Sequence, residues 1–363
     1  MALLLNHAYH VGWICARREE MVAARAMLDE DHGVIRGEGQ DYNTYFAGRI
    51  HDHHVVIAVL PAGIDGKISA ASVATDMART FNWLRFVLLV GVGGGIPRLE
   101  GVDIRLGDVV VSQPNGDSGG VVQYDKGKSI HGGGFIRQGI LRPPPNMLLT
   151  ALTALQVEHV LNGSYQMSAY LTEMMEHRPG LKDKGYCRPT PPIDRLFKPT
   201  YQHADSGRDC TMCSPAEEIK RDARVNGDPK IHYGVIASGE RVVEDPVFRD
   251  SLHKSYRALC VETEAAGVLH NFPCLVIRGI CHYADSHKND DWRSYAAMTA
   301  AAYAKELLTY VSSGDVAFEK PVEEVEEVEE GWSARRLNMA PSRSSGSHQS
   351  AGLEEQAQSQ FAT

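Results

Sequence analysis

Short apolar runs alternate with stretches of helical periodicity from about residue 10 to about residue 311. The predicted strands, all rich in Val, Ile and Leu, are 10–15, 54–60, 85–97, 107–114, 231–239 and 274–281. The predicted helices, which carry apolar side chains at helical spacing, are 18–28, 68–81 and 295–311. Because the strand runs are apolar on both sides, they predict a single α/β domain with a mostly parallel sheet covered by helices.

Two regions interrupt this pattern, and we place the domain at residues 8–312. Within it, residues 176–230 are rich in Pro, Asp, Arg and Lys and lack periodicity, which predicts a long polar excursion on the surface. Residues 313–363 begin with the acidic run "EKPVEEVEEVEEGW" and end in Ser- and Gln-rich sequence. We expect this tail to be disordered, and we interpret its acidic run as solvated, with a marginal helix or a partner-binding segment as alternatives.

Composition narrows the class of protein. Hydrophobic residues make up 43% and charged residues 23% of the 363-residue chain, as in ordinary soluble globular proteins. The net charge of −9 and the lack of a Lys/Arg stripe argue against nucleic-acid binding. No apolar run is long enough to span a membrane, and the N-terminal "MALLLNHAYH" lacks the basic region of a signal peptide. The odd number of cysteines, 7, predicts reduced thiols and a cytoplasmic protein, with the nucleus as the alternative compartment.

The glycine-rich "VGVGGGIP" follows a predicted strand and is the first candidate for a site. Its glycines, Gly91, Gly93, Gly94 and Gly95, let the backbone approach a ligand and leave amide N–H groups free. The chain continues as "IPRLEGVD" and opens no helix, which argues against a Rossmann cofactor site, and no P-loop motif occurs. We interpret the loop as part of a small-molecule site, with a tight turn between strands as the alternative.

Two carboxylates form the second candidate, within "CVETEAAGVLHNF". Glu262 and Glu264 lie where an apolar strand gives way to the helix-forming "AAGVL". A carboxylate is costly to bury unless it is paired or hydrogen-bonded, and vicinal sugar hydroxyls are natural partners for it. An equally good interpretation is a carboxylate at a helix start, where the macrodipole favours it.

The segment "PCLVIRGICHYADSHKN" starts as a buried strand and ends in a polar cluster. Open α/β sheets build sites where strands deliver polar groups at their C-terminal ends. His282 lies three residues before Asp285 and five before His287. Its reference pKa near ~6.5 makes it a candidate proton carrier, with a purely structural histidine as the alternative.

A C-x-x-C pair, Cys210 and Cys213, follows His203 by seven residues, with Cys187 further back. A structural zinc needs four nitrogen or sulfur ligands, and only one tight pair is present. We therefore expect two free thiols and no metal or other cofactor, with zinc at His203, Cys210 and Cys213 as the weaker alternative.

Taken together, these segments resemble the nucleoside phosphorylase and nucleosidase superfamily, most closely its fungal branch. The matching stretches run in family order over roughly residues 10–312 and include "LPAGIDGKISAASVA", "LLVGVGGGIP", "HYGVIASGERV", "CVETEAAGVLHNFPCLVIRGIC" and "YADSHKN". The resemblance implies a twisted mixed central sheet flanked by helices in a homo-oligomer. It also implies cleavage of the N-glycosidic bond of a small-molecule nucleoside or nucleotide.

The resemblance assigns roles to individual residues. Glu20 matches the carboxylate that positions the attacking water in the nucleosidases, and Glu264 matches the glutamate that grips the ribose hydroxyls. The loop Gly91–Gly95 matches the one beside the ribose and the nucleophile. In that loop Val92 stands where several members have a serine, and Leu89 stands where some phosphorylases have a phosphate-binding arginine. These two changes favour water over phosphate, which is the possible co-substrate.

Other positions depart further from the family. Thr263 replaces a methionine that contacts the sugar, and Val242 falls near the base-stacking position. His282 stands where the family has an aspartic acid that serves purine N7 as the base leaves. A protonated histidine also donates to N7, and general acid catalysis contributes about 10²–10⁴-fold. Asp285 matches the second, usually structural, aspartate of the pattern.

Two functions therefore stay open, and we favour the first. It is an active purine N-glycosidase that uses Glu20, Glu264 and His282 or Asp285. The second is a nucleoside-binding or sensing module of the same fold with little or no turnover. A pure interaction scaffold draws only on the acidic tail and the polar excursion. The lack of an obvious Arg cluster argues only weakly against a 5′-phosphate on the substrate, because Arg105, Arg241 and Arg278 could converge in the fold.

Overall fold

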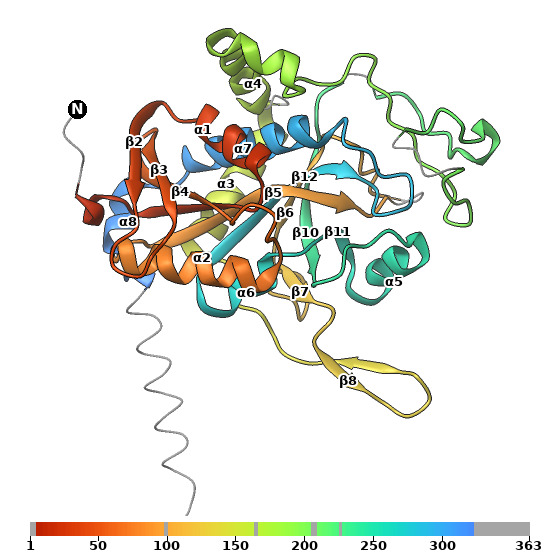
Figure 1. Cartoon of the computed structure of the whole chain (residues 1–363), viewed down its shortest axis with the longest axis horizontal. Coiled ribbons are helices and arrows are strands. Elements are labelled where there is room, and N and C mark those ends of the chain that lie inside the picture. The colour runs from red at the N-terminus through yellow and green to blue at the C-terminus, as the bar shows by residue number, and fades with distance from the viewer. Residues whose placement is uncertain (1–4, 98–100, 163–165, 205–208, 225–226, 323–363) are drawn as a thin grey trace, which may run out of the picture. The chain divides into compact units, whose positions relative to one another are not determined.

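A computed structural model describes residues 5–97, 101–162, 166–204, 209–224 and 227–322 (Figure 1). The predicted disordered tail lies outside the described residues from 323 onward. Its first part, 313–322, is described and belongs to the folded domain. There the helix α8 (Ser313–Phe318) buries Val316, and the amide N–H of Val322 donates to the Leu84 carbonyl at 2.8 Å.

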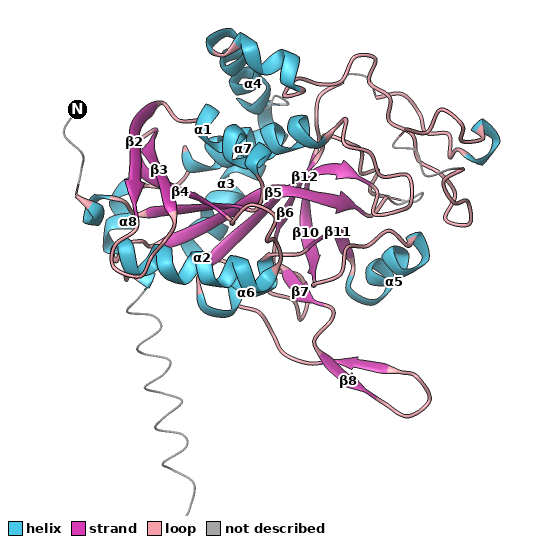
Figure 2. Cartoon of the chain, in the orientation of Figure 1, coloured by secondary structure: helices cyan, strands magenta, loops and turns pink. Residues whose placement is uncertain are grey.

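The secondary structure alternates between strands and helices along most of the chain (Figure 2). The strands are β1 (Val11–Cys15), β2 (Glu30–Arg36), β3 (Thr44–Ile50), β4 (His53–Val59), β5 (Phe86–Gly95), β6 (Val109–Ser112), β7 (Val121–Gln123), β8 (Gly127–Ser129), β9 (Phe135–Arg137), β10 (Ile231–Ser238), β11 (Ala258–Glu262) and β12 (Cys274–His282). The remaining helices are α1 (Arg18–Ala26), α2 (Lys67–Thr80), α3 (Asn146–Asn162), α4 (Gln166–His177), α5 (Pro246–Tyr256), α6 (Ala265–Asn271), α7 (Arg293–Leu308) and the short 3₁₀ turns η1 (Asn6–Ala8), η2 (Pro179–Lys184) and η3 (Pro215–Glu217).

The central sheet is mixed, as the resemblance implies, and this prediction is confirmed. Its strand order is β11-β10-β6-β12-β5-β1-β4-β3-β2, with β7 paired to β10. The inner pairs β1–β4, β1–β5 and β5–β12 are parallel, whereas β2–β3, β3–β4 and β6–β12 are antiparallel. The strands β8 and β9 form a separate hairpin.

The glycine-rich end of β5 closes part of this sheet into a ring. Besides β1 and β12, β5 pairs with β11, where Gly94 lies opposite Val261 and Gly95 lies opposite Cys260. The strands β5, β12, β6, β10 and β11 therefore form a closed circuit of hydrogen-bonded neighbours. The carboxyl ends of β5, β11 and β12 meet at one edge of this circuit.

Helices cover both faces of the sheet (Figure 1), which explains the continuous apolar runs. Trp13 and Leu88 pack into the core beneath α1, α3, α4 and α7. The next residue of each strand, Ile14 or Leu89, packs into the opposite core with α2 and α6. The predicted helix 295–311 corresponds to α7, which is buried from Tyr295 to Leu308 because it lies directly on β12 and β5.

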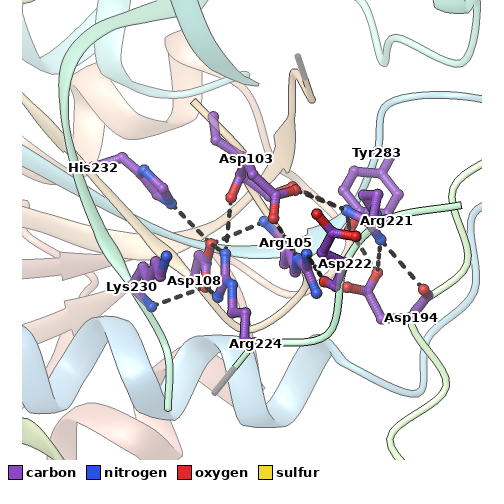
Figure 3. Close-up of polar contacts among 11 residues, drawn as sticks. Asp103, Arg105, Asp108, Asp194, Arg221, Asp222, Arg224, Lys230, His232 and Tyr283 are labelled. Atoms are coloured by element: carbon purple, nitrogen blue, oxygen red, sulfur yellow. Dashed lines mark hydrogen bonds and ion pairs between the residues drawn. The ribbon is translucent and has the colours of Figure 1, made fainter. Parts of the chain in front are cut away.

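The polar excursion, 176–230, is attached to the sheet by paired charges (Figure 3). Asp108, fully buried just before β6, accepts hydrogen bonds from Arg224 at 2.6 and 2.7 Å and faces His232 Nε2 at 2.8 Å. Arg221 lies 2.9 Å from Asp194 and donates to the hydroxyl of Tyr283 at 2.9 Å. The charged composition of the excursion therefore includes ion pairs made against the body of the domain.

Candidate functional site

The predicted site residues converge on one small cavity at the edge where β5, β11 and β12 end. Its volume is about 70 Å³, far below the ~300–1,000 Å³ of typical ligand pockets. The predicted residues that line it are Glu20, Val92, Gly93, Gly94, Val242, Glu262, Thr263, Glu264 and His282. Segments separated by more than half of the chain thus contribute to a single site.

Glu20 lies in the first turn of α1, where its carboxylate points back to the backbone. Oε2 accepts the amide N–H groups of Ala16 at 2.6 Å and Arg17 at 3.1 Å, and Oε1 accepts that of Val92 at 2.8 Å. A carboxylate at this position caps a helix start, so part of its role is structural. The contact with Val92 also joins α1 to the glycine loop. Burial raises the pKa of Glu20, and Arg278 opposes this shift.

Arg278 organises the other two carboxylates from beneath the cavity. Its fully buried guanidinium contacts Glu262 and lies 3.2 Å from Oε2 of Glu264. Burial alone would lower the pKa of Arg278, but the surrounding glutamates hold it above its usual value. Arg278 is therefore a fixed positive charge among three buried carboxylates, those of Glu20, Glu262 and Glu264.

Glu262 and Glu264 occupy different environments within this group. Oε2 of Glu262 accepts the amide N–H groups of Glu264 at 3.1 Å and Ala265 at 2.9 Å, as expected for a carboxylate at the start of α6. Burial raises the pKa of Glu262. Glu264 accepts the Thr263 hydroxyl at 2.5 Å. Glu262 therefore stabilises the helix start, whereas Glu264 faces the cavity.

Gly91 makes this packing possible without lining the cavity itself. A Cβ atom at position 91 would lie 2.5 Å from Oε1 of Glu20 and 2.6 Å from Nη1 of Arg278. Both distances are shorter than any normal contact, so only glycine lets the two charged groups approach the strand. At Gly94, a Cβ atom would lie 2.6 Å from Cε1 of His282. The lack of side chains at Gly91 and Gly94 therefore leaves the space that Glu20, Arg278 and His282 occupy.

His282 ends β12 and turns its half-buried ring toward the cavity. Its Nδ1 accepts the amide N–H of Ala284 at 3.0 Å. Burial, followed by the positive charges of Lys288 and Arg293, lowers the pKa of His282 to about 3. The ring is consequently neutral at physiological pH.

Asp285 is placed differently from the other predicted residues. It does not line the cavity, and its buried carboxylate lies 3.6 Å from Arg249 and accepts the amide N–H of His287 at 3.0 Å. Burial raises its pKa, and Arg249 opposes this shift. The geometry suits a residue that shapes the β12–α7 loop. Val242 lies at the mouth of the cavity and is 62% exposed.

Positive charges also surround the site, and Arg278 is the most deeply buried of them. Arg278 is a charged residue inside the apolar run "LVIRGI", which was a visible signal of a buried ion pair. The cavity is also lined by Arg17, Arg241, Lys288 and Arg293. Of the three arginines considered for a 5′-phosphate, Arg241 lines the cavity and Arg278 contacts its carboxylates, whereas Arg105 donates to Asp103 at 2.6 Å.

The weaker zinc alternative, His203 with Cys210 and Cys213, lies outside the residues that line this cavity. Its three candidate ligand atoms are within 4.8 Å of one another.

Among the helices of the described residues, none is long and apolar enough to cross a membrane.

Comparison with curated proteins gives three informative relatives, although no family model matches the chain. A nucleotide-binding leucine-rich repeat (NLR)-like protein of Hyaloscypha variabilis is 42% identical over 310 residues, which cover 85% of this chain and 30% of the relative. The ATP nucleosidase Cap17 of Escherichia coli is 23% identical, covering 68% of this chain and 40% of the relative. The chain thus spans less than half the length of both proteins. The 5′-methylthioadenosine/S-adenosylhomocysteine nucleosidase of Mycobacterium tuberculosis is 25% identical, covering 83% of this chain and 96% of the relative.

Solved structures agree with this comparison at the level of the fold. The 5′-methylthioadenosine/S-adenosylhomocysteine nucleosidase of Helicobacter pylori superposes with a TM-score of 0.53 at 19% identity, covering 83% of this chain and 98% of that one. Futalosine hydrolase of the same organism has a TM-score of 0.53 at 20% identity, with the same coverage. The chain therefore has the nucleoside phosphorylase-like fold of the methylthioadenosine/S-adenosylhomocysteine nucleosidases.

Proposed function

We propose that this chain hydrolyses the N-glycosidic bond of a purine nucleoside or nucleotide. The observation that carries the proposal is the group of buried carboxylates, Glu20, Glu262 and Glu264, around the single buried charge of Arg278. Glycoside cleavage passes through an oxocarbenium-like transition state that carries positive charge. An excess of fixed negative charge beside the sugar stabilises that state more than the neutral substrate.

Each residue has a role that fits its geometry. Glu264, fixed by Arg278 and Thr263, accepts hydrogen bonds from the sugar hydroxyls. Glu20 accepts a proton from the water whose oxygen bonds to C1′ while the C1′–N9 bond breaks. His282 donates its Nε2–H to N7 of the departing base. A neutral imidazole stabilises that base by hydrogen bonding and keeps its own proton, so the proton that the base gains comes from solvent.

The same arrangement favours water over phosphate as the nucleophile. Leu89, at the position of a phosphate-binding arginine in some phosphorylases, is fully buried in the core with α2 and α6. The carboxylate of Glu20, beside the glycine loop, would repel a phosphate anion. The side chain of Val92, in the same loop, has no hydrogen-bond donor for a phosphate.

The cationic rim supports a substrate with a phosphorylated 5′ end. Arg17, Arg241, Lys288 and Arg293 line the cavity around the anionic floor. Phosphate groups bind such cations through charge-assisted hydrogen bonds. The similarity to an ATP nucleosidase agrees with this charge distribution. We therefore rank AMP and ATP above adenosine and methylthioadenosine as substrates.

The test is release of free base from adenosine, inosine, guanosine, uridine, methylthioadenosine, AMP and ATP, with and without inorganic phosphate. We expect phosphate-independent release of a purine base, faster from the nucleotides. Glu264→Gln should reduce kcat by at least about 100-fold, whereas the control Glu176→Gln, an exposed site on α4, should not. Strict dependence on phosphate would contradict hydrolysis, and release of uracil alone would contradict the purine assignment.

A nucleoside-binding or sensing module is the second candidate. The departures from the family pattern at Thr263 and His282 favour it. The cavity, about 70 Å³, must widen before a nucleoside can bind under either function, so its volume does not separate them. Calorimetric binding of AMP or adenosine without release of base, restored to turnover by His282→Asp, would establish this function instead.

The proposal also covers the oligomeric state of the chain and its branch of the superfamily. We infer that the chain forms a homo-oligomer, and light scattering of the purified protein tests this, since a monomeric mass would contradict it. The 42% identity to the NLR-like protein supports placing the chain in the fungal branch of the superfamily.

A further inference from the structure

A second group of chemically active side chains lies in the polar excursion, apart from the proposed catalytic cavity. His203, Cys210 and Cys213 each offer a ligand atom, and these atoms all lie within 4.8 Å of one another. A tetrahedral zinc ion holds sulfur at about 2.3 Å and nitrogen at about 2.0–2.1 Å, which puts neighbouring ligand atoms about 3.3–3.8 Å apart. Only a small contraction of the three side chains would reach that geometry.

A fourth candidate ligand, His287, comes from the β12–α7 loop. Its ring is 9% exposed and is stacked on Phe197, with ring centres 4.1 Å apart and planes inclined by 18°. Neither of its ring nitrogens has a hydrogen-bond partner among the described residues. Buried polar groups are almost always hydrogen-bonded, so an imidazole buried in this way calls for another partner.

His287 lies beside His203. Its ring centre is 5.4 Å from that of His203. The amide N–H of His203 donates to the hydroxyl of Ser286 at 3.1 Å, which fixes the excursion against the residue next to His287. Two segments far apart in sequence thus bring the His287 ring beside His203, just outside the group of three ligand atoms that lie within 4.8 Å of one another.

We propose that His203, Cys210, Cys213 and His287 bind a structural zinc ion. Two thiolates and two imidazoles are a common ligand set for zinc, and carboxylate-preferring ions such as magnesium and calcium are disfavoured by it. On binding, both thiols release their protons to solvent, and the neutral imidazoles bind through their lone pairs. The inference stands on different residues from the proposed catalysis and does not depend on it.

Neighbouring groups hold the ligands in the way that outer contacts do around protein-bound zinc. Arg195 donates to the carbonyl oxygen of Cys210 at 2.6 Å and lies 3.4 Å from that of Cys213, so it fixes the turn between them. Nε2 of His203 is 2.9 Å from the carbonyl oxygen of Asp209, so this ring is held against the backbone that leads to Cys210. Oδ1 of Asp285 lies 3.9 Å from Nδ1 of His287. A carboxylate beside the ring nitrogen that does not bind the metal is common for zinc-bound histidines.

The zinc ion would link the excursion to the loop that follows His282. His287 is five residues beyond His282, and Lys288, the next residue, lines the proposed catalytic cavity. The metal would therefore fix one wall of that cavity from outside. This also gives Asp285 a place in the structure, since it contacts His287 and does not line the cavity.

The first experiment measures metal content by inductively coupled plasma mass spectrometry on the full chain purified under reducing conditions without a metal-affinity tag. We expect close to one zinc ion per chain. Cys213→Ser and His287→Gln should each weaken zinc affinity by at least about 10-fold, since losing an outer-shell partner alone costs about 10–100-fold. The matched controls Cys187→Ser, in the same excursion, and His270→Gln, exposed at the end of α6, should retain the metal.

A second measurement keeps the test valid if the variants fail to fold. X-ray absorption of the zinc-loaded natural chain should give two sulfur and two nitrogen neighbours at about 2.3 and about 2.0–2.1 Å. Removing zinc with a chelator should speed tryptic cleavage within 187–224. No zinc bound under reducing conditions, a Cys210–Cys213 disulfide in place of the metal, or a shell of oxygen ligands would overturn the proposal.

Discussion

The amide N–H of Ala284 donates to Nδ1 of His282 at 3.0 Å. A ring nitrogen that accepts a hydrogen bond carries a lone pair, so the neutral imidazole holds its proton on Nε2. The pKa of His282, lowered to about 3 by burial and by Lys288 and Arg293, keeps the ring neutral above mildly acidic pH. His282 is therefore suited to donate a hydrogen bond, in contrast to the protonated acid considered from the sequence.

Replacing His282 separates hydrogen-bond donation from proton transfer. We expect His282→Ala to reduce kcat for base release by at least about 100-fold, the usual effect of losing one donor to a developing charge. His282→Gln keeps an N–H donor and should retain more activity than the alanine variant. Steady-state rates near neutral pH make the comparison. Equal rates in the two variants would show that donation from this position does not matter.

The low pKa of His282 also predicts a dependence of stability on pH. In the unfolded chain this histidine titrates near ~6.5, whereas in the folded chain it titrates at about 3. Between these values the unfolded state binds a proton that the folded state does not, so stability falls as pH falls. Urea midpoints at about pH 7 and about pH 4.5 should therefore differ less for His282→Gln than for the natural protein. Identical losses would contradict the lowered pKa.

Removing the charge of Arg278 should destabilise the whole domain. Arg278→Met leaves Glu262 and Glu264 buried without their partner, which costs about 3–5 kcal/mol of unfolding free energy. The control is Arg79→Met, whose ion pair with Asp76 spans 3.4 Å on a 70% exposed side chain. That change should stay within about 0.5 kcal/mol. If urea unfolding gave similar losses for both variants, the buried pairing would not be what stabilises the site.

A methyl group at position 91 tests the packing beneath the cavity. Gly91→Ala would place its Cβ atom 2.5 Å from Glu20 and 2.6 Å from Arg278. Overpacking of this kind costs about 1–3 kcal/mol and should displace Glu20, with loss of base release. At Gly180 a Cβ atom meets nothing within 4 Å, so Gly180→Ala is the matched control. Full activity and stability in Gly91→Ala would show that the two charged groups move aside freely.

The attachment of the excursion can be tested at Asp108. Burial alone would raise its pKa, but hydrogen bonds from Arg224 and His232 hold that pKa below its usual value. Asp108→Asn leaves the guanidinium of Arg224 without its counter-charge, which should cost about 3–5 kcal/mol. Limited trypsin digestion should then cut after Arg221 or Arg224 faster than in Asp183→Asn, an exposed site of the same excursion. Unchanged digestion would mean that other contacts hold the segment.

The parts of the fold that the sequence predicted are those whose strands are buried on both faces. β5 and β12 carry unbroken apolar runs because helices cover both sides of the sheet at these strands. The pair β2 and β3 was missed because β2 lies at the edge of the sheet and alternates between half-buried and exposed residues. Edge strands need few apolar residues, so periodicity gives a weak signal there.

The site was predicted from local patterns, and its omissions were long-range contacts. Glu264 and His282 come at the ends of β11 and β12, and a strand end is where polar groups gather, so each was recognised locally. These two strands are antiparallel to each other, and the residues converge because β5 pairs with both strands near their ends. Asp285 has the same local pattern, but it follows a turn at Ala284, with φ of 51°, and does not line the cavity. The pair of Asp108 and Arg224 joins residues 116 positions apart, which no local pattern reveals.

The closure of β5 against β11 has a consequence for how a molecule reaches the floor of the cavity. Hydrogen bonds to β12 along one edge and to β11 at its glycine end leave β5 little freedom to shift. Widening must come from the roof, where Val242 and Lys288 lie outside the strands. The strands below the ligand would thus stay fixed while the loop residues above it move. The rate of that loop movement would limit both the binding of substrate and the release of products.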